Sequence, residues 1–173
     1  MTKKVYNKNE LAFASMHARN EADRWRESAK KILEDLILNR EAYVLFIYSS
    51  EIYLKSLLMA LNVDVISNKS HNLYDLYIEI PDENLKKAIK QSVEISPLPL
   101  YDENDDIDES DKIVLKSFEY FLKYISNGFI YYRYEYEKFL NKEIITWPNL
   151  FVVNLNDALY NISRNIVYEK VNQ

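Results

Sequence analysis

Hydrophobic residues recur at intervals of three and four along most of the chain, which is the period of an amphipathic α-helix. The N-terminal segment carries one such seam without a break, and many of its members are small: Leu11, Ser15, Ala18, Ala22, Trp25, Ala29, Ile32 and Leu36. The pattern predicts a long helix, which Asn9 is expected to cap at its start. Small residues let a second helix approach closely, so the seam fits a helical hairpin within one chain or a dimer interface. We favour the hairpin.

Segment 41–63 is apolar on nearly every side, which is typical of the buried central helix of a bundle. Its length also fits a membrane span. However, Glu51 and Lys55 lie in its middle, and each charge at mid-span costs several kcal/mol. We therefore predict the interior helix of a soluble bundle and no membrane segment.

Four further helical segments are predicted downstream. One opens near residue 71 and is interrupted by Pro81, and the next covers 82–95 with the inward positions Leu85, Ala88, Ile89 and Val93. The helix after it has the inward positions Val114, Leu115, Phe118, Phe121, Leu122 and Ile125. The last helix begins at Trp147 with Pro148 in its first turn, and its inward face holds Phe151, Leu155, Ala158, Leu159, Ile162 and Ile166.

Two segments depart from this pattern. Residues 96–111 combine two prolines with a dense run of acidic side chains, which predicts an exposed loop. As a calcium-binding loop this run fails, because Ile107 stands where the turn requires glycine. Segment 129–137 alternates tyrosines with charged residues, as in a strand, but it also has aromatic residues at helical spacing. In an otherwise helical chain we predict a helix there.

Composition narrows the fold class. The chain has 173 residues, of which one is glycine and four are proline, whereas hairpin-rich folds use many glycines in their turns. We predict an all-α, up-and-down helical bundle of five to seven helices. A chain of this length suits a single domain over residues 1–173.

Charge and cysteine content limit the classes of function that the chain can have. The net charge is −5, so no general field attracts nucleic acid or anionic lipid, and any RNA contact must come from a few placed residues. The chain has no cysteine and no apolar signal segment at its N-terminus, which points to the cytoplasm. The 15 tyrosines fit either the codon bias of an AT-rich genome or a tyrosine-lined recognition surface.

Glu51 and Lys55 are one helical turn apart on the most hydrophobic helix, where unpaired charges are expensive. One interpretation is an internal ion pair with a structural role. The other is a polar strip of Tyr48, Glu51 and Lys55 that faces a cleft and binds a ligand.

A second pair, Arg133 and Glu137, has the same spacing and is surrounded by tyrosines, among them Tyr132 and Tyr136. It is either an exposed ion pair or a site where arginine binds phosphate and tyrosines stack on bases. His71 stands at a helix start, either as a capping or packing residue or as an acid–base group, because imidazole titrates near neutral pH. The sequence predicts no metal site and no cofactor.

Three short motifs follow one another along the chain. SSEIYLKSLL (49–58) contains an E-x-x-x-K turn, SHNLYDLY (70–77) contains an H-x-L-x-x-L step, and FIYYRYEYE (129–137) contains an arginine late in the sequence. In this order they resemble the HEPN superfamily, over residues 41–80 and 128–140. The resemblance implies a HEPN-like bundle, commonly a homodimer, in toxin–antitoxin, phage-defence or RNA-processing systems.

Catalytic members of that superfamily are metal-independent ribonucleases that use an arginine followed, four to six residues later, by a histidine. Arg133 matches the arginine, but Lys138, Phe139 and Leu140 offer no general base where the histidine is expected. The resemblance therefore implies Arg133 and His71 as the catalytic candidates, with His71 in place of the missing histidine.

Three functions fit these observations. The first is a HEPN-like domain that binds RNA, a nucleotide or a cognate partner, with weak or absent ribonuclease activity. Its expected partners are a second copy of the chain and a cognate antitoxin or nucleotidyltransferase-like protein. The second is a non-catalytic protein-interaction or dimerisation module, and the third is an active ribonuclease with an unusual site.

Overall fold

The computed structural model describes residues 6–34, 39–65, 70–94, 118–126 and 149–171. Within these residues the chain forms six helices and no strand: α1 (Lys8–Leu33), α2 (Asn39–Ala60), α3 (Leu73–Ile78), α4 (Glu83–Glu94), α6 (Phe118–Ser126) and α9 (Asn149–Val171). The predicted all-α helical bundle is thus confirmed. The acidic stretch 96–111 and the segment 129–137 lie outside the described residues.

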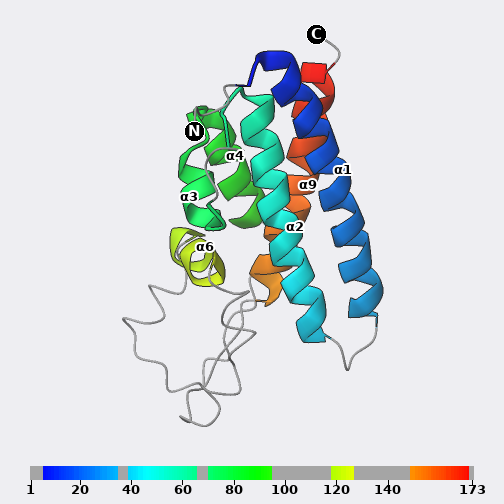
Figure 1. Cartoon of the computed structure of the whole chain (residues 1–173). Coiled ribbons are helices and arrows are strands. Elements are labelled where there is room, and N and C mark those ends of the chain that lie inside the picture. Colours follow the sequence, from blue (N-terminus) through cyan, green and yellow to red (C-terminus); the bar gives the residue numbers. More distant parts are fainter. Residues whose placement is uncertain (1–5, 35–38, 66–69, 95–117, 127–148, 172–173) are drawn as a thin grey trace.

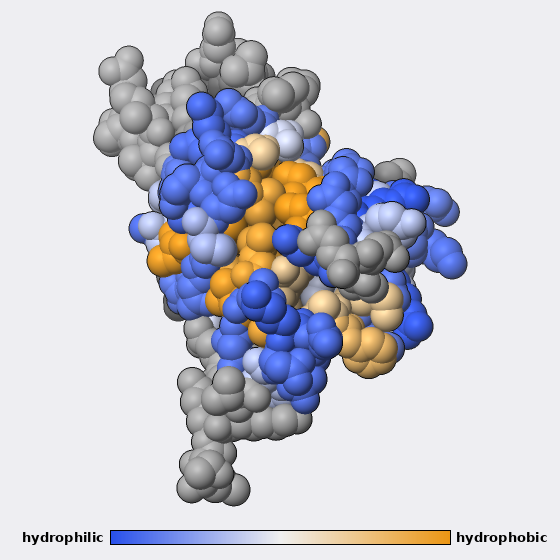
Figure 2. Space-filling view, turned by 90° about the horizontal axis from the view of Figure 1, so that it is seen from above, coloured by the Kyte–Doolittle hydropathy of each residue, from blue (hydrophilic) through white to orange (hydrophobic). Residues whose placement is uncertain are grey.

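The three long helices α1, α2 and α9 lie side by side, with α1 antiparallel to the other two (Figure 1). Helix α3 packs against α2, and α4 packs against α9. Figure 2 views the end of the bundle where α1 begins and α9 ends, and it shows hydrophobic residues gathered at the centre of that end with hydrophilic residues around them. The buried residues of α2, from Ala42 to Ala60, extend this core along the bundle.

Helix α1 begins with a capping box. The Asn7 side chain accepts a hydrogen bond from the Glu10 backbone N–H at 3.0 Å, and the Glu10 carboxylate accepts one from the Asn7 N–H at 2.9 Å. The prediction that Asn9 caps this helix was wrong, since Asn9 already lies in the first turn. Asn7 is preferred because it has a glutamate three residues later to complete the reciprocal pair.

The apolar seam of α1 packs against α2 of the same chain, as expected for the hairpin. Leu11, Ser15, Ala22 and Ala29 are buried, whereas Trp25 is only half-buried and its neighbour Arg26 is buried instead. The Ser49 hydroxyl donates to the Ala22 carbonyl at 2.9 Å, and the Ser56 hydroxyl donates to the Ser15 carbonyl at 2.8 Å. Such bonds from a side chain to the neighbouring backbone require closely approaching helices, which the small residues permit.

Helix α2 is the interior helix that its sequence predicted. It contacts α1, α3 and α9, and its buried residues cover most of its circumference: Ala42, Phe46, Ile47, Ser49, Ser50, Ile52, Tyr53, Leu54, Ser56, Leu57, Leu58, Met59 and Ala60. In the part of the chain that the structure describes, no helix is both long enough and apolar enough to cross a membrane.

Helix α2 ends without glycine. Asn62 adopts a left-handed φ of 63°, the Val63 N–H donates to the Leu58 carbonyl at 2.8 Å, and the Asn62 N–H donates to the Met59 carbonyl at 3.0 Å. This is a Schellman ending, in which asparagine replaces the usual glycine because its short polar side chain tolerates this conformation. The ending turns the chain back toward α2 before α3 begins.

A buried asparagine joins α9 to α2. Asn156 is fully buried, and its Nδ2 donates to the Phe46 carbonyl and to the Ser50 hydroxyl oxygen, both at 3.0 Å. The Ser50 hydroxyl in turn donates to the Phe46 carbonyl at 2.8 Å. The inward positions predicted for α9 are buried at Phe151, Leu155, Ala158 and Leu159 and half-buried at Ile162 and Ile166.

The shorter helices complete the core. The Asn72 side chain caps α3 and that of Asp82 caps α4, each accepting two backbone N–H bonds. In α6 the predicted residues Phe118, Phe121, Leu122 and Ile125 are buried, and in α4 so are Leu85, Ile89 and Val93. Ala88 is exposed, contrary to prediction. The inward stripe of α4 follows a spacing of four, which leaves Ala88 beside it rather than on it.

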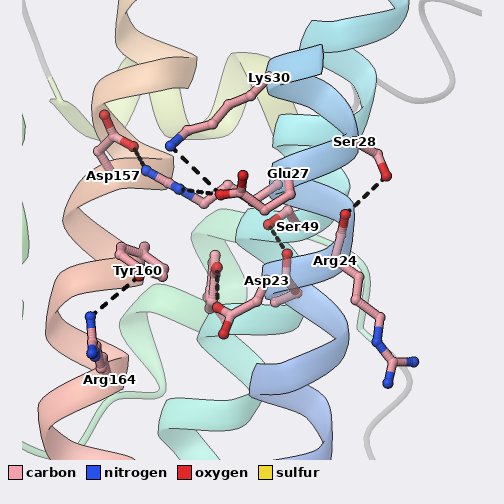
Figure 3. Close-up of polar contacts among 12 residues, drawn as sticks. Asp23, Arg24, Glu27, Ser28, Lys30, Ser49, Asp157, Tyr160 and Arg164 are labelled. Carbon is pink, nitrogen blue, oxygen red and sulfur yellow. Dashed lines mark hydrogen bonds and ion pairs between the residues drawn. The ribbon is translucent and has the colours of Figure 1, made fainter. Parts of the chain in front are cut away.

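A polar network links α1, α2 and α9. The buried Tyr53 hydroxyl donates to the Asp23 carboxylate at 2.6 Å, and Arg26 forms an ion pair with Asp157 while its guanidinium stacks on the Tyr160 ring at 4.3 Å. Figure 3 shows Asp23 on α1, with Asp157 and Tyr160 on α9, at this junction. The network fixes α9 against the hairpin through charges whose partners lie on different helices.

This network predicts a specific loss of stability in alkali. Burial, followed by the bond to Asp23, raises the pKa of Tyr53 above its ordinary value of 10.0. Because the folded pKa is raised, the contribution of Tyr53 is complete below about pH 10 and is lost as the pH rises further. We expect the difference in unfolding free energy between the wild type and Tyr53→Phe to shrink by about 1 kcal/mol between about pH 8 and pH 10.6. Urea unfolding at both pH values measures this, and an unchanged difference would contradict it.

Candidate functional site

The structure describes half of the predicted site residues. Tyr48, Glu51, Lys55 and His71 lie in described segments, on α2 and just before α3. The second predicted group, comprising Tyr132, Arg133, Tyr136 and Glu137, lies outside the described residues. The site is therefore built here from the first group.

The predicted pair on α2 forms in the structure. Lys55 Nζ lies 2.6 Å from Glu51 Oε1. The side chain of Glu51 is 12% exposed and that of Lys55 is 21% exposed. Both charges therefore lie at the margin of the core, where partial desolvation strengthens their attraction relative to a fully solvated pair.

His71 joins this pair from a different segment. Its Nδ1 lies 2.9 Å from the same Glu51 Oε1, although the two residues are 20 positions apart in sequence. The imidazole itself is 76% exposed. His71 thus neither caps α3, which Asn72 does, nor packs in the core, so the capping and packing interpretations of this histidine were wrong.

The contacts of Glu51 determine what His71 is able to do. An ionised carboxylate only accepts hydrogen bonds, so a neutral His71 must carry its proton on Nδ1 and present Nε2 as the acceptor. A carboxylate that holds one imidazole nitrogen in this way fixes the tautomer and leaves the other nitrogen to exchange protons. Because the ring is exposed, that nitrogen is accessible to a ligand in solvent.

Tyr48 extends the strip by one turn of α2. Its ring meets the Trp25 ring edge-on, with the ring centroids 5.3 Å apart. Burial raises the pKa of Tyr48, and the carboxylates of Glu21 and Glu51 raise it further. The phenol therefore stays protonated at neutral pH and is able to donate a hydrogen bond to a ligand beside Glu51.

Sequence reasoning placed Tyr48, Glu51 and Lys55 on one strip but left the position of His71 open. The position of His71 follows from two features after α2, the turn at Asn62 and the Asn72 cap, whose backbone N–H also bonds to the Ser70 hydroxyl oxygen at 3.2 Å. Trp25, which completes the strip from α1, had been assigned to the apolar seam. No sequence signal marked it as a neighbour of Tyr48.

The described residues contain no group of three histidine, cysteine, aspartate or glutamate side chains placed to hold a metal ion. The arrangement thus offers two cationic or protonatable groups around one carboxylate, together with a phenol and an indole. Comparison with family models, with curated proteins and with solved structures gives no match to this chain.

Proposed function

We propose that this chain is a HEPN-like domain that binds RNA or a nucleotide at the surface formed by Tyr48, Glu51, Lys55 and His71. The observation that carries the proposal is the convergence of Lys55 and His71 on one carboxylate. The two HEPN-like motifs that supply these residues, E-x-x-x-K and H-x-L-x-x-L, are separate in sequence and adjacent in space, as parts of one site would be.

The charges at this surface suit a phosphate. With His71 protonated, two cations face one carboxylate, and a phosphate oxygen would complete the balance. Arg133 would add a third cation, as the resemblance implies.

Phosphate binding at this surface predicts that single charge deletions weaken RNA binding. We expect Lys55→Gln to weaken binding of a fluorescein-labelled single-stranded RNA about tenfold, since a charged hydrogen bond contributes about 1.5–3 kcal/mol. His71→Gln should also weaken binding, because it removes the second group that would contact the phosphate beside Glu51. Fluorescence anisotropy measures both effects.

The matched control is Lys87→Gln, which removes an exposed lysine on α4 outside this surface. If Lys55→Gln and His71→Gln bind RNA as Lys87→Gln does, the proposed surface is wrong. The same RNA, incubated with wild type, His71→Ala and Arg133→Ala, tests for cleavage. Cleavage that survives both substitutions would remove these residues from any ribonuclease mechanism.

A second candidate function is a protein-interaction or dimerisation module that acts without a nucleic-acid ligand. The internal pairing of Glu51 with Lys55 favours it, because the pair then needs no external partner. The exposed Phe13 ring on α1 is an apolar group that a protein partner would cover. Sizing in solution, alone and with a cognate antitoxin or nucleotidyltransferase-like protein, tests this function and the expected homodimer.

A further inference from the structure

An open pocket of about 520 Å³ lies between α1 and α9. Its lining consists of Arg19 from α1 and of Arg164, Asn165, Tyr168 and Glu169 from α9. Pockets that bind small molecules typically measure about 300–1,000 Å³. The size therefore fits a small ligand, and each of the lining side chains carries a polar or charged group.

The first arginine of this pocket, Arg19, is held by an ion pair with a residue of its own helix. Arg19 Nη2 lies 2.7 Å from Asp23 Oδ2, and the other oxygen of Asp23 accepts the hydrogen bond of the buried Tyr53 hydroxyl at 2.6 Å. Arg19 Nε is buried, and among the described residues it has no hydrogen-bond partner. One edge of this guanidinium is thus fixed by the protein.

The second arginine has a similar support. Arg164 is exposed, and its Nη1 lies 3.5 Å from the Tyr160 hydroxyl, as Figure 3 shows. The Tyr160 ring is held beneath the guanidinium of Arg26, which is paired with Asp157. The network that joins α1, α2 and α9 therefore also supports both arginines that line the pocket.

The charged side chains that line the pocket indicate the class of ligand that it would bind. Two arginines and one glutamate line the pocket, and the carboxylate of Asp23 pairs with Arg19 from within α1. Guanidinium groups present donors in a fork that matches the oxygens of phosphate, and two such groups on facing helices suit a group with several acceptor oxygens.

The geometry points to this pocket as a binding site for a small phosphate monoester, whose phosphate contacts Arg19 and Arg164. The site is distinct from the surface around Glu51. Arg19 and Asp23 lie on the side of α1 that faces α9, whereas Glu21 and Trp25 lie on the side near Tyr48, as the period of 3.6 residues per turn requires. The inference therefore goes beyond the proposed function and does not depend on it.

The test is calorimetric titration of the full chain with adenosine monophosphate and ribose 5-phosphate, with adenosine and ribose as the matched compounds without phosphate. We expect both phosphate monoesters to bind and both unphosphorylated compounds to fail. Arg164→Gln should weaken binding at least about tenfold, because it removes a charged donor. Since Arg164 is exposed, this variant is expected to fold. Arg19→Lys, which keeps the charge but removes the fork, should also weaken binding.

The control variant is Arg24→Gln, since Arg24 is an exposed arginine of α1 that points away from α9 (Figure 3). It should bind like the wild type. The inference is overturned if neither phosphate monoester binds, if adenosine binds as well as its monophosphate, or if Arg164→Gln binds as Arg24→Gln does.

Discussion

Replacing Phe46 by alanine is expected to lower the unfolding free energy by about 3–5 kcal/mol. The Phe46 side chain is 1% exposed, on the interior helix α2. Its removal loses the transfer free energy of the ring and leaves a cavity that three packed helices are unable to close by a small shift. A loss of this size is a large fraction of the stability of a typical domain.

Chemical denaturation with urea, followed by circular dichroism, measures this loss. The control is Phe13→Ala, which removes the same side chain from a position on α1 that is 61% exposed, and it should change stability by less than about 0.5 kcal/mol. Similar losses in the two variants would mean that α2 is not the interior helix of the bundle.

The fold was predictable where a local pattern decides the outcome. The uniform hydrophobicity of α2 identified the central helix, and the small residues of α1 favoured a close helical hairpin over a dimer interface, because burial and packing depend on these residues directly. The start of α1 was also locally encoded, but the signal was the pair Asn7 and Glu10 rather than Asn9 alone.

Features that depend on distant residues were not predictable in this way. Arg26 is buried because it pairs with Asp157, 131 positions away, and stacks on the ring of Tyr160. The sequence shows a charged residue next to a seam, and nothing local distinguishes it from a solvated arginine. Because Arg26 is buried, the inward face of α1 is directed toward α9, and Trp25 lies half-buried beside Tyr48.

The same distinction between local and distant determinants holds for the candidate site. The i, i+4 spacing of Glu51 and Lys55 was sufficient to predict their pairing, since helix geometry brings such residues together. The third member, His71, depends on the path of the chain after α2, which Asn62 turns back without a glycine. The sequence left the position of His71 open, and only the fold brings the imidazole to within 2.9 Å of Glu51.

Replacing Asn156 by aspartate is expected to lower the unfolding free energy at neutral pH by at least about 3 kcal/mol. Asn156 is fully buried and donates two hydrogen bonds, to the Phe46 carbonyl and to the Ser50 hydroxyl oxygen. A carboxylate donates none. It would be buried as a charge with its oxygen facing a carbonyl oxygen, so the substitution removes two bonds and adds repulsion.

The sign of the pH dependence separates this explanation from a simple packing defect. Burial would raise the pKa of the introduced carboxyl in the folded state, while in the unfolded chain it titrates near 3.9. The penalty is therefore small below about pH 4 and grows as the pH rises, because only the protonated acid is able to donate the hydrogen bond that the amide made. Urea unfolding at about pH 4.5 and pH 7 should show most of the loss only at the higher value. Asn161→Asp, at an exposed position of the same helix, should show almost none at either pH, and a loss at Asn156 that is independent of pH would mean that the two hydrogen bonds are not what this residue contributes.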